Sequence, residues 1–206
     1  MTEIRNVEVY ELFDSIIACR NPMRTTWPTT YTEEEYRASL KRAVKLVQAS
    51  KNGEVKCHDN FLTGIRVSFD IKYPNYLSPE LQRYHFLDIV SSSSKMHRLT
   101  NMDMDACFNE YVCTGAKEMM KELLAQYNQA ESTEDKYKAF MRLVSNCPLG
   151  VELFMRVSTN YKQLQTIYFQ RKNHKLKEDW GAIIQMIERL PLAHELIIGD
   201  KTDVDL

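Results

Sequence analysis

The chain has 206 residues, of which 44% are apolar, with 27 Lys and Arg against 28 Asp and Glu. This ordinary globular composition excludes a disordered chain and a small disulfide-held scaffold, and it suffices for one domain over residues 1–206. A formal net charge of −1 argues against binding to polymeric nucleic acid, which needs a basic excess. Because no apolar run reaches about 18 residues and the N-terminal residues lack a signal pattern, we expect a cytoplasmic protein that crosses no membrane.

The first half of the chain predicts one helix and one strand. Thr32 opens a capping box, and apolar residues follow it at helical spacing, which predicts a helix over residues 32–50. Residues 63–73 alternate apolar and polar side chains, as in a strand with one buried face. Pro74 and Pro79 then mark a break.

The second half predicts mainly helices. Apolar spacing predicts one or two helices over residues 104–127, punctuated by Gly115, and Ser132 caps a further helix that Pro148 ends. A short strand over residues 151–157 precedes a helix that Asn160 caps and that runs to about residue 173. A last helix covers residues 178–190. The predicted fold class is therefore α/β in the mixed (α+β) sense, and rich in helix.

The cysteines indicate reduced thiols. The set is odd and contains no C-x-x-C pair, so it suggests neither a disulfide framework nor a zinc site of thiolates, and we expect no metal. The five are Cys19, Cys57, Cys107, Cys113 and Cys147.

A first candidate site is the segment 83–98, which carries cationic side chains on both sides of four consecutive serines, residues 91–94. Guanidinium, ammonium and hydroxyl groups are the donors that phosphate recognition uses. The plain alternative is a solvated polar loop, and composition alone favours it because no Gly-rich phosphate loop is present.

A second candidate pairs Asn160 with Arg171. Eleven residues are close to three helical turns, so both side chains project from one face, roughly 16 Å apart. Leu164 and Ile167 lie on the same stripe, so a buried guanidinium there needs a partner. Either Arg171 forms a salt bridge with an internal acid, or it points into a ligand pocket.

Together the two segments resemble the flavin-dependent thymidylate synthase family, whose signature contains R-H-R-x7-S. Arg83, Tyr84 and His85 stand at the R-H-R positions, Ser93 follows after seven intervening residues, and Lys95 stands where the motif has its last Arg. That family also has an Asn opening a long helix and an essential Arg eleven residues on, as Asn160 and Arg171 do, and Lys162 stands where another Arg is common. The stretch Ala18-Cys19-Arg20 resembles the family's N-terminal A-A-R element more weakly.

The resemblance implies a domain with a central sheet and several long helices, which assembles as a homotetramer whose active sites are each built from several chains. It implies FAD as cofactor and transfer of a one-carbon unit from methylenetetrahydrofolate to C5 of dUMP, with NADPH as a further co-substrate. Position by position it implies a catalytic role for Arg171, nucleotide contacts at Glu80, Arg83, Ser91, Ser93 and Lys95, and flavin contacts at Arg83, Tyr84, His85, Asn160, Lys162 and Thr166.

The departures from the family pattern leave alternatives open. Glu80 replaces a Gln, and a carboxylate there could accept a hydrogen bond from an exocyclic amine, which would favour dCMP over dUMP. The altered signature also fits a catalytically degenerate member that acts as a nucleotide-binding or protein-interaction module, and a third alternative is an unrelated helical interaction protein. On the enzyme hypothesis, Ser93 and Arg171 line one anion-accepting cavity, within one chain or between chains.

Overall fold

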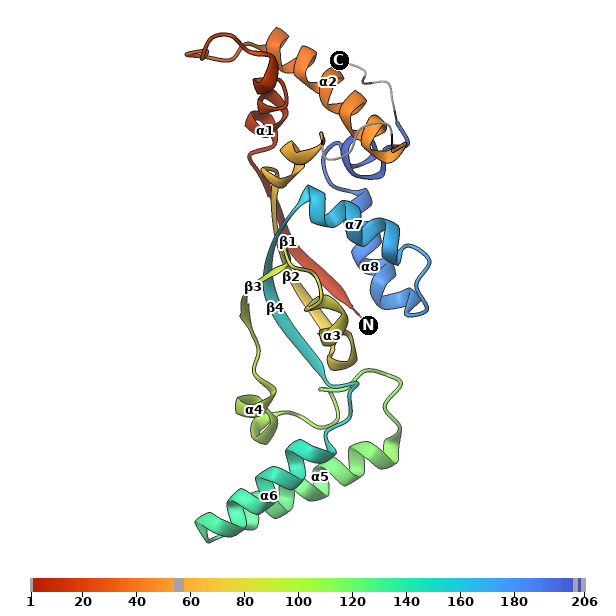
Figure 1. Cartoon of the computed structure of the whole chain (residues 1–206). Coiled ribbons are helices and arrows are strands. Elements are labelled where there is room, and N and C mark those ends of the chain that lie inside the picture. Colours follow the sequence, from red (N-terminus) through yellow and green to blue (C-terminus); the bar gives the residue numbers. More distant parts are fainter. Residues whose placement is uncertain (1, 54–57, 202–203, 205–206) are drawn as a thin grey trace.

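The computed structural model of the chain describes residues 2–53, 58–201 and 204, and it centres on a four-stranded antiparallel sheet (Figure 1). The order of strands across the sheet is β1-β2-β4-β3. The strands are β1 Glu3–Tyr10, β2 Arg66–Pro74, β3 Asp88–Ser92 and β4 Glu152–Asn160. The sheet confirms the predicted mixed α/β class, and β2 and β4 confirm both predicted strands.

The sheet has one buried and one open face because its central strand alternates. Along β2, Val67, Phe69 and Ile71 are buried, whereas the intervening Ser68 and Asp70 are partly exposed. Residues directly opposite each other on neighbouring strands share a face, so β4 follows the same division.

Helices α7 and α8 cover the buried face (Figure 1). Their Leu164, Ile167 and Ile183 meet Phe69 and Val157 of the sheet in the main core. Helix α7 (Tyr161–Arg171) follows β4 directly, α8 is Lys177–Glu188, and a π-helical turn spans His194–Ile198. Helices α1 (Leu12–Ala18) and α2 (Glu33–Lys51) extend this core beyond one end of the sheet.

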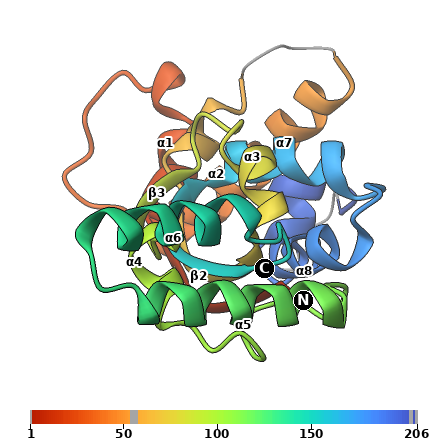
Figure 2. The same cartoon turned by 90° about the horizontal axis from the view of Figure 1, so that it is seen from below.

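Two further helices form an arm at the other end of the sheet. Helices α5 (Thr114–Gln129) and α6 (Thr133–Asn146) lie side by side in both views (Figures 1 and 2). Their Met120 and Leu143 belong to a second, smaller core with Phe108 and Val151. The short helix α3 (Ser78–Leu81) lies between β2 and β3, and the short helix α4 (Lys95–Arg98) lies between β3 and α5.

The prediction of helix from residue 104 is wrong, because α5 begins only at Thr114. Within this segment, residues 107–109 instead pair with the chain just before β4 and at its start: Phe108 bridges Val151, and Glu152 N donates a hydrogen bond to Cys107 O. Their apolar side chains enter the second core from an irregular segment, so tertiary pairing overrides the helical spacing. Strands β1 and β3 and helix α1 were not predicted.

None of the helices in the described part of the chain is both long and apolar enough to span a membrane. Among the same residues no group of His, Cys, Asp and Glu could hold a metal, and Cys19, Cys107, Cys113 and Cys147 are free thiols. The prediction for Cys57 falls outside the described residues.

Asn160 caps α7 as predicted. Loss of this cap should measurably lower the free energy of unfolding. Its side chain accepts a hydrogen bond from Gln163 N at 2.8 Å, and the residue is 3% exposed. We expect Asn160→Ala to lower the free energy of unfolding by about 1–2 kcal/mol, because the first turn of α7 loses its cap inside the core. Urea denaturation measures this. Ser132→Ala, at the exposed cap of α6, is the matched control and should cost less.

Candidate functional site

Arg171, the last residue of α7, lies in a compact polar cluster with residues of the 80–84 segment. Its Nε donates to the Tyr84 hydroxyl at 2.7 Å, and its Nη1 lies 3.2 Å from Glu80 Oε2. Its side chain is only 14% exposed. The Tyr84 hydroxyl in turn donates to Gln170 Oε1 at 3.1 Å. Thus the two segments singled out in the sequence meet here, and Arg171 forms the internal salt bridge.

Trp180 of α8 packs against this cluster and contacts both Glu80 and Arg171. The ring is fully buried, and its Nε1 donates to Glu80 Oε2 at 2.7 Å. The Arg171 guanidinium lies 4.6 Å from the Trp180 ring centroid and 5.6 Å from that of Tyr84, which are cation–π distances. His174 Nε2 stands 3.7 Å from the same Glu80 oxygen. Arg171 is therefore held in one orientation, as a charge that Glu80 largely balances.

The 83–86 turn is tied to the start of α7. Thr159 Oγ1 donates to Phe86 O at 2.7 Å, and Phe86 N donates to Gln163 Oε1 at 3.3 Å. Arg83 and His85 flank the buried Tyr84 and are exposed. The structure thus brings four of the predicted flavin-contact residues to one corner: Arg83, Tyr84, His85 and Asn160.

Lys162 and Thr166 line a neighbouring cavity of about 340 Å³ beside α7. Lys162 Nζ lies 2.5 Å from Asp59 Oδ2, and Asp59 is 1% exposed. Lys51 supplies a second cation, and Phe169 presents a ring that is 40% exposed. Cationic groups beside an aromatic surface suit a phosphate attached to a planar base.

The serine run lies elsewhere, on the open face of the sheet. Ser91 and Ser93 line a cavity of about 650 Å³, where Ser93 exchanges hydrogen bonds with the Phe154 backbone at 2.8 and 2.9 Å. The three cations of this cavity are all ion-paired: Arg5 with Glu3, Lys72 with Glu152 and Arg156 with Asp70. Lys95 does not line it and begins α4 instead. Ser94 caps that helix.

Within one chain, therefore, Ser93 and Arg171 share no cavity that the described residues form. Ser93 lies on the open face of the sheet, whereas α7 packs on the buried face. The sheet separates them, because neighbouring positions of a strand point to opposite faces. A site built between chains stays a prediction.

No model of a known protein family matches the sequence, and no curated protein matches it. Solved structures do match. The flavin-dependent thymidylate synthase ThyX of Helicobacter pylori, complexed with FAD and dUMP, is 17% identical, with a TM-score of 0.67 over 95% of this chain and 97% of that chain. The UMP/dUMP methylase PolB of Streptomyces cacaoi, bound with 5-Br dUMP, is 15% identical, with a TM-score of 0.60 over 96% and 94%. The chain has the fold of the flavin-dependent thymidylate synthases.

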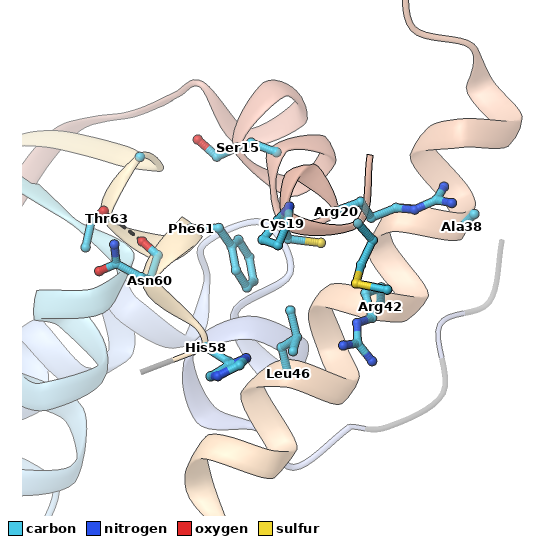
Figure 3. A pocket seen from close by; sticks show the side chains of 14 residues that line it. Ser15, Cys19, Arg20, Ala38, Arg42, Leu46, His58, Asn60, Phe61 and Thr63 are labelled. Carbon is cyan, nitrogen blue, oxygen red and sulfur yellow. Dashed lines mark hydrogen bonds between the residues drawn. The ribbon is translucent and has the colours of Figure 1, made fainter. Parts of the chain in front are cut away.

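The structure also contains a cavity that the sequence did not predict (Figure 3). It measures about 910 Å³ and lies between α1, α2 and the segment before β2, with apolar walls that include Leu46 and Phe61. Arg20 and Arg42 line it, and none of the described residues forms an ion pair with either. In the sequence, the only sign of this cavity was Arg20 in the A-C-R stretch. No sequence motif links Arg20 with Arg42, because they come from separate segments of the chain.

Cys19 also lines this cavity, and burial raises the pKa of its thiol to about 11. Only about one in a thousand such thiols is ionised at pH 8, and the thiolate is the reactive form. We therefore expect Cys19 to react with iodoacetamide far more slowly than the exposed Cys113 at this pH, and to gain rate up to about pH 11. Peptide mass mapping over time measures both rates. Equal rates at pH 8 would contradict the buried position of Cys19.

Proposed function

We propose that this protein transfers a one-carbon unit to C5 of a pyrimidine deoxynucleotide in a flavin-dependent reaction. The observation that carries the proposal is the cluster of Glu80, Tyr84 and Arg171, because it joins the two motif segments around one fixed guanidinium. The fold supports it, since the solved structures that share it include a synthase complexed with FAD and dUMP and a UMP/dUMP methylase.

The residues around the start of α7 fit one end of FAD. Lys162 and Lys51 suit its phosphate groups, Thr166 offers a hydroxyl, and Phe169 offers a stacking surface in the cavity of about 340 Å³. Arg83 and His85 remain exposed at the adjacent corner. When bound, FAD would supply the redox chemistry of the one-carbon transfer, with methylenetetrahydrofolate as the proposed donor and NADPH as the proposed reductant.

Arg171 would act on the pyrimidine ring and not on the phosphate. Glu80 at 3.2 Å largely balances its charge, so the pair would attract a phosphate dianion only weakly. The guanidinium could still donate hydrogen bonds to a neutral ring edge. The Tyr84 and Trp180 rings hold the guanidinium in place, so its remaining N–H groups stabilise negative charge that develops on the ring without reorganising. Preorganised donors of this kind typically contribute about 10²–10³ in rate.

The nucleotide phosphate would be held by another copy of the chain. Ser93, with Ser91 and Lys95 nearby in sequence, lies on the side of the sheet away from α7, so one chain does not present these groups and Arg171 together. We therefore propose a homotetramer in which the serine segment of one copy faces the Arg171 cluster of a second copy.

Glu80 favours dCMP as an alternative substrate to dUMP. Its Oε2 already accepts from Trp180 Nε1 and faces Arg171, so the carboxylate is fixed in place. An ionised carboxylate only accepts hydrogen bonds, and the exocyclic amine of cytosine is a donor that uracil lacks.

A catalytically inactive nucleotide-binding module is the second candidate function. The internal salt bridge of Arg171 favours it, because a paired guanidinium is less available to a reacting ring. Calorimetry with dUMP, dCMP and FAD separates the two candidates: the enzyme binds both a nucleotide and FAD, whereas the module binds a nucleotide without FAD.

Titration with FAD tests the cofactor assignment directly. We expect Lys162→Ala to weaken FAD binding about 10-fold or more, because a charged hydrogen bond to phosphate is worth about 1.5–3 kcal/mol. Lys138→Ala, which removes an exposed Lys paired with Glu134 on the arm, is the matched control and should bind as the wild type. Melting curves show whether loss of the Asp59 contact unfolds the variant, and Thr166→Val probes the same cavity without that contact. Unchanged affinity in both cavity variants would contradict the assignment.

A further inference from the structure

Helix α4 ends in an arginine whose charge no acid of the described chain balances. The Arg98 side chain forms no ion pair and no hydrogen bond with any described residue, and its Nη1 is buried away from water. Buried polar groups of folded proteins are almost always hydrogen-bonded, and a guanidinium has five N–H groups to donate. Arg98 is therefore suited to an acceptor that comes from outside the described residues.

The ring of Phe154 holds this guanidinium on the open face of the sheet. Arg98 Cζ lies 4.9 Å from the ring centroid, which is a cation–π distance, and Phe154 is 53% exposed. Phe154 stands opposite Lys72 of β2, and both side chains lie on the open face. The backbone of the same Phe154 exchanges two hydrogen bonds with Ser93, at 2.8 and 2.9 Å. One residue of β4 therefore positions both Arg98 and Ser93.

The Ser93 hydroxyl is able to donate to an anion bound beside Arg98. Its Oγ accepts a hydrogen bond from Phe154 N, and no described residue accepts one from the hydroxyl. Ser93 and Phe154 both line the cavity of about 650 Å³, which is within the usual range for small-molecule sites. A hydroxyl and a guanidinium side by side are donors that suit phosphate.

No acid in the surrounding segment cancels the charge of Arg98. Residues 89–102, which include the serine run and α4, contain neither Asp nor Glu. The three cations that line the cavity are all ion-paired, so they add little net charge. A phosphate dianion at Ser93 would therefore be attracted mainly by the unpaired guanidinium of Arg98.

Lys95 is less well placed for this role, although the family motif points to it. It does not line the cavity. Burial raises the pKa of the Cys147 thiol and the Lys95 ammonium partly offsets this rise, so Lys95 lies near the end of α6. A guanidinium also offers two parallel N–H groups for a bidentate contact with phosphate, whereas an ammonium acts as a point charge.

We propose that Arg98 and the Ser93 hydroxyl together bind the 5′-phosphate of the nucleotide, and that Phe154 positions both groups. Arg98 is then the residue that selects a nucleoside monophosphate over the free nucleoside. The identity of the nucleotide rests on the proposed function, whereas the phosphate site rests on the contacts of Arg98, Phe154 and Ser93.

Calorimetric titration of the full chain with dUMP in the presence of FAD tests this assignment. We expect Arg98→Gln to weaken dUMP binding about 10-fold or more, because charge-assisted hydrogen bonds to phosphate are lost. Lys95→Gln should weaken it less, and Arg98→Lys, which keeps the charge, should retain part of the affinity. Arg37→Gln, which removes an exposed Arg paired with Glu33 on α2, is the matched control and should bind as the wild type.

Two further ligands separate a phosphate contact from a change in fold. Deoxyuridine lacks the phosphate, so its affinity, read by ligand-observed NMR, should be nearly the same for Arg98→Gln and the wild type. Inorganic phosphate lacks the base, so it should bind the wild type and be weakened by Arg98→Gln. Melting curves show that each variant is folded.

The outcomes distinguish this phosphate site from the proposed function. Equal dUMP affinity of Arg98→Gln and the wild type, or an equal loss for dUMP and deoxyuridine, would overturn the phosphate site and leave the proposed function in place. A wild type that binds inorganic phosphate through Arg98 but binds neither dUMP nor dCMP would contradict the proposed function and support the phosphate site.

Discussion

Replacing Arg171 with alanine is expected to lower the turnover of the pyrimidine nucleotide at least about 100-fold. The guanidinium is the fixed donor of the site, held by Tyr84 at 2.7 Å and by Glu80 at 3.2 Å, and the loss of one preorganised donor typically costs about 10²–10³ in rate. FAD binding should change little, because Arg171 does not line the cavity of Lys162. Single-turnover methyl transfer and FAD titration measure the two effects.

The control for this variant separates chemistry from folding. Arg171→Ala leaves the partly buried Glu80 without its partner, and this can destabilise the chain. The double variant Arg171→Met, Glu80→Gln removes both charges and should regain much of the lost stability without regaining turnover. A double variant with turnover near that of the wild type would refute a catalytic role for Arg171.

Trp180→Ala is expected to have the largest effect on stability. The ring is fully buried in the main core, and truncation of such a ring costs about 3–5 kcal/mol. The variant also loses the hydrogen bond from Trp180 Nε1 to Glu80 and the cation–π contact with Arg171. For a chain of this size, Tm should fall by roughly 6–20 °C.

Trp27 supplies the matched control, because it is the other tryptophan of the chain and is 94% exposed. Trp27→Ala should change the free energy of unfolding by less than about 0.5 kcal/mol. Trp180→Phe keeps most of the buried area but not the hydrogen bond, so it should fall between the two. Calorimetric scans of the three variants measure this order, and equal Tm values for the two alanine variants would contradict the position of Trp180.

The sequence predicted those elements whose signals are local. Strand β2 alternates strictly because one of its faces is buried, and α2 begins at the capping box of Thr32. Strand β3 was not predicted because all its residues are exposed, Ser91 and Ser92 among them, so its sequence shows no alternation of apolar and polar residues. Strand β1 was not predicted because a bulge at Asn6 interrupts its alternation of apolar and polar residues.

The site was predictable only in part, for a similar reason. The helical spacing of Arg171 showed that a buried guanidinium would need a partner, but not that the partner would be Glu80, far earlier in the chain. The sequence also could not show that Ser93 lies across the sheet from α7, since this depends on how β3 pairs with β4. Arg20 and Arg42 meet at their cavity only through the packing of α1 and α2.

The visible absorption spectrum of the purified protein tests the central claim most directly. The protein is incubated with FAD, desalted and then titrated with dUMP and, separately, with dCMP. The account predicts a yellow protein that retains FAD and whose flavin bands shift when one of the nucleotides binds. A protein that stays colourless after incubation with FAD would contradict it.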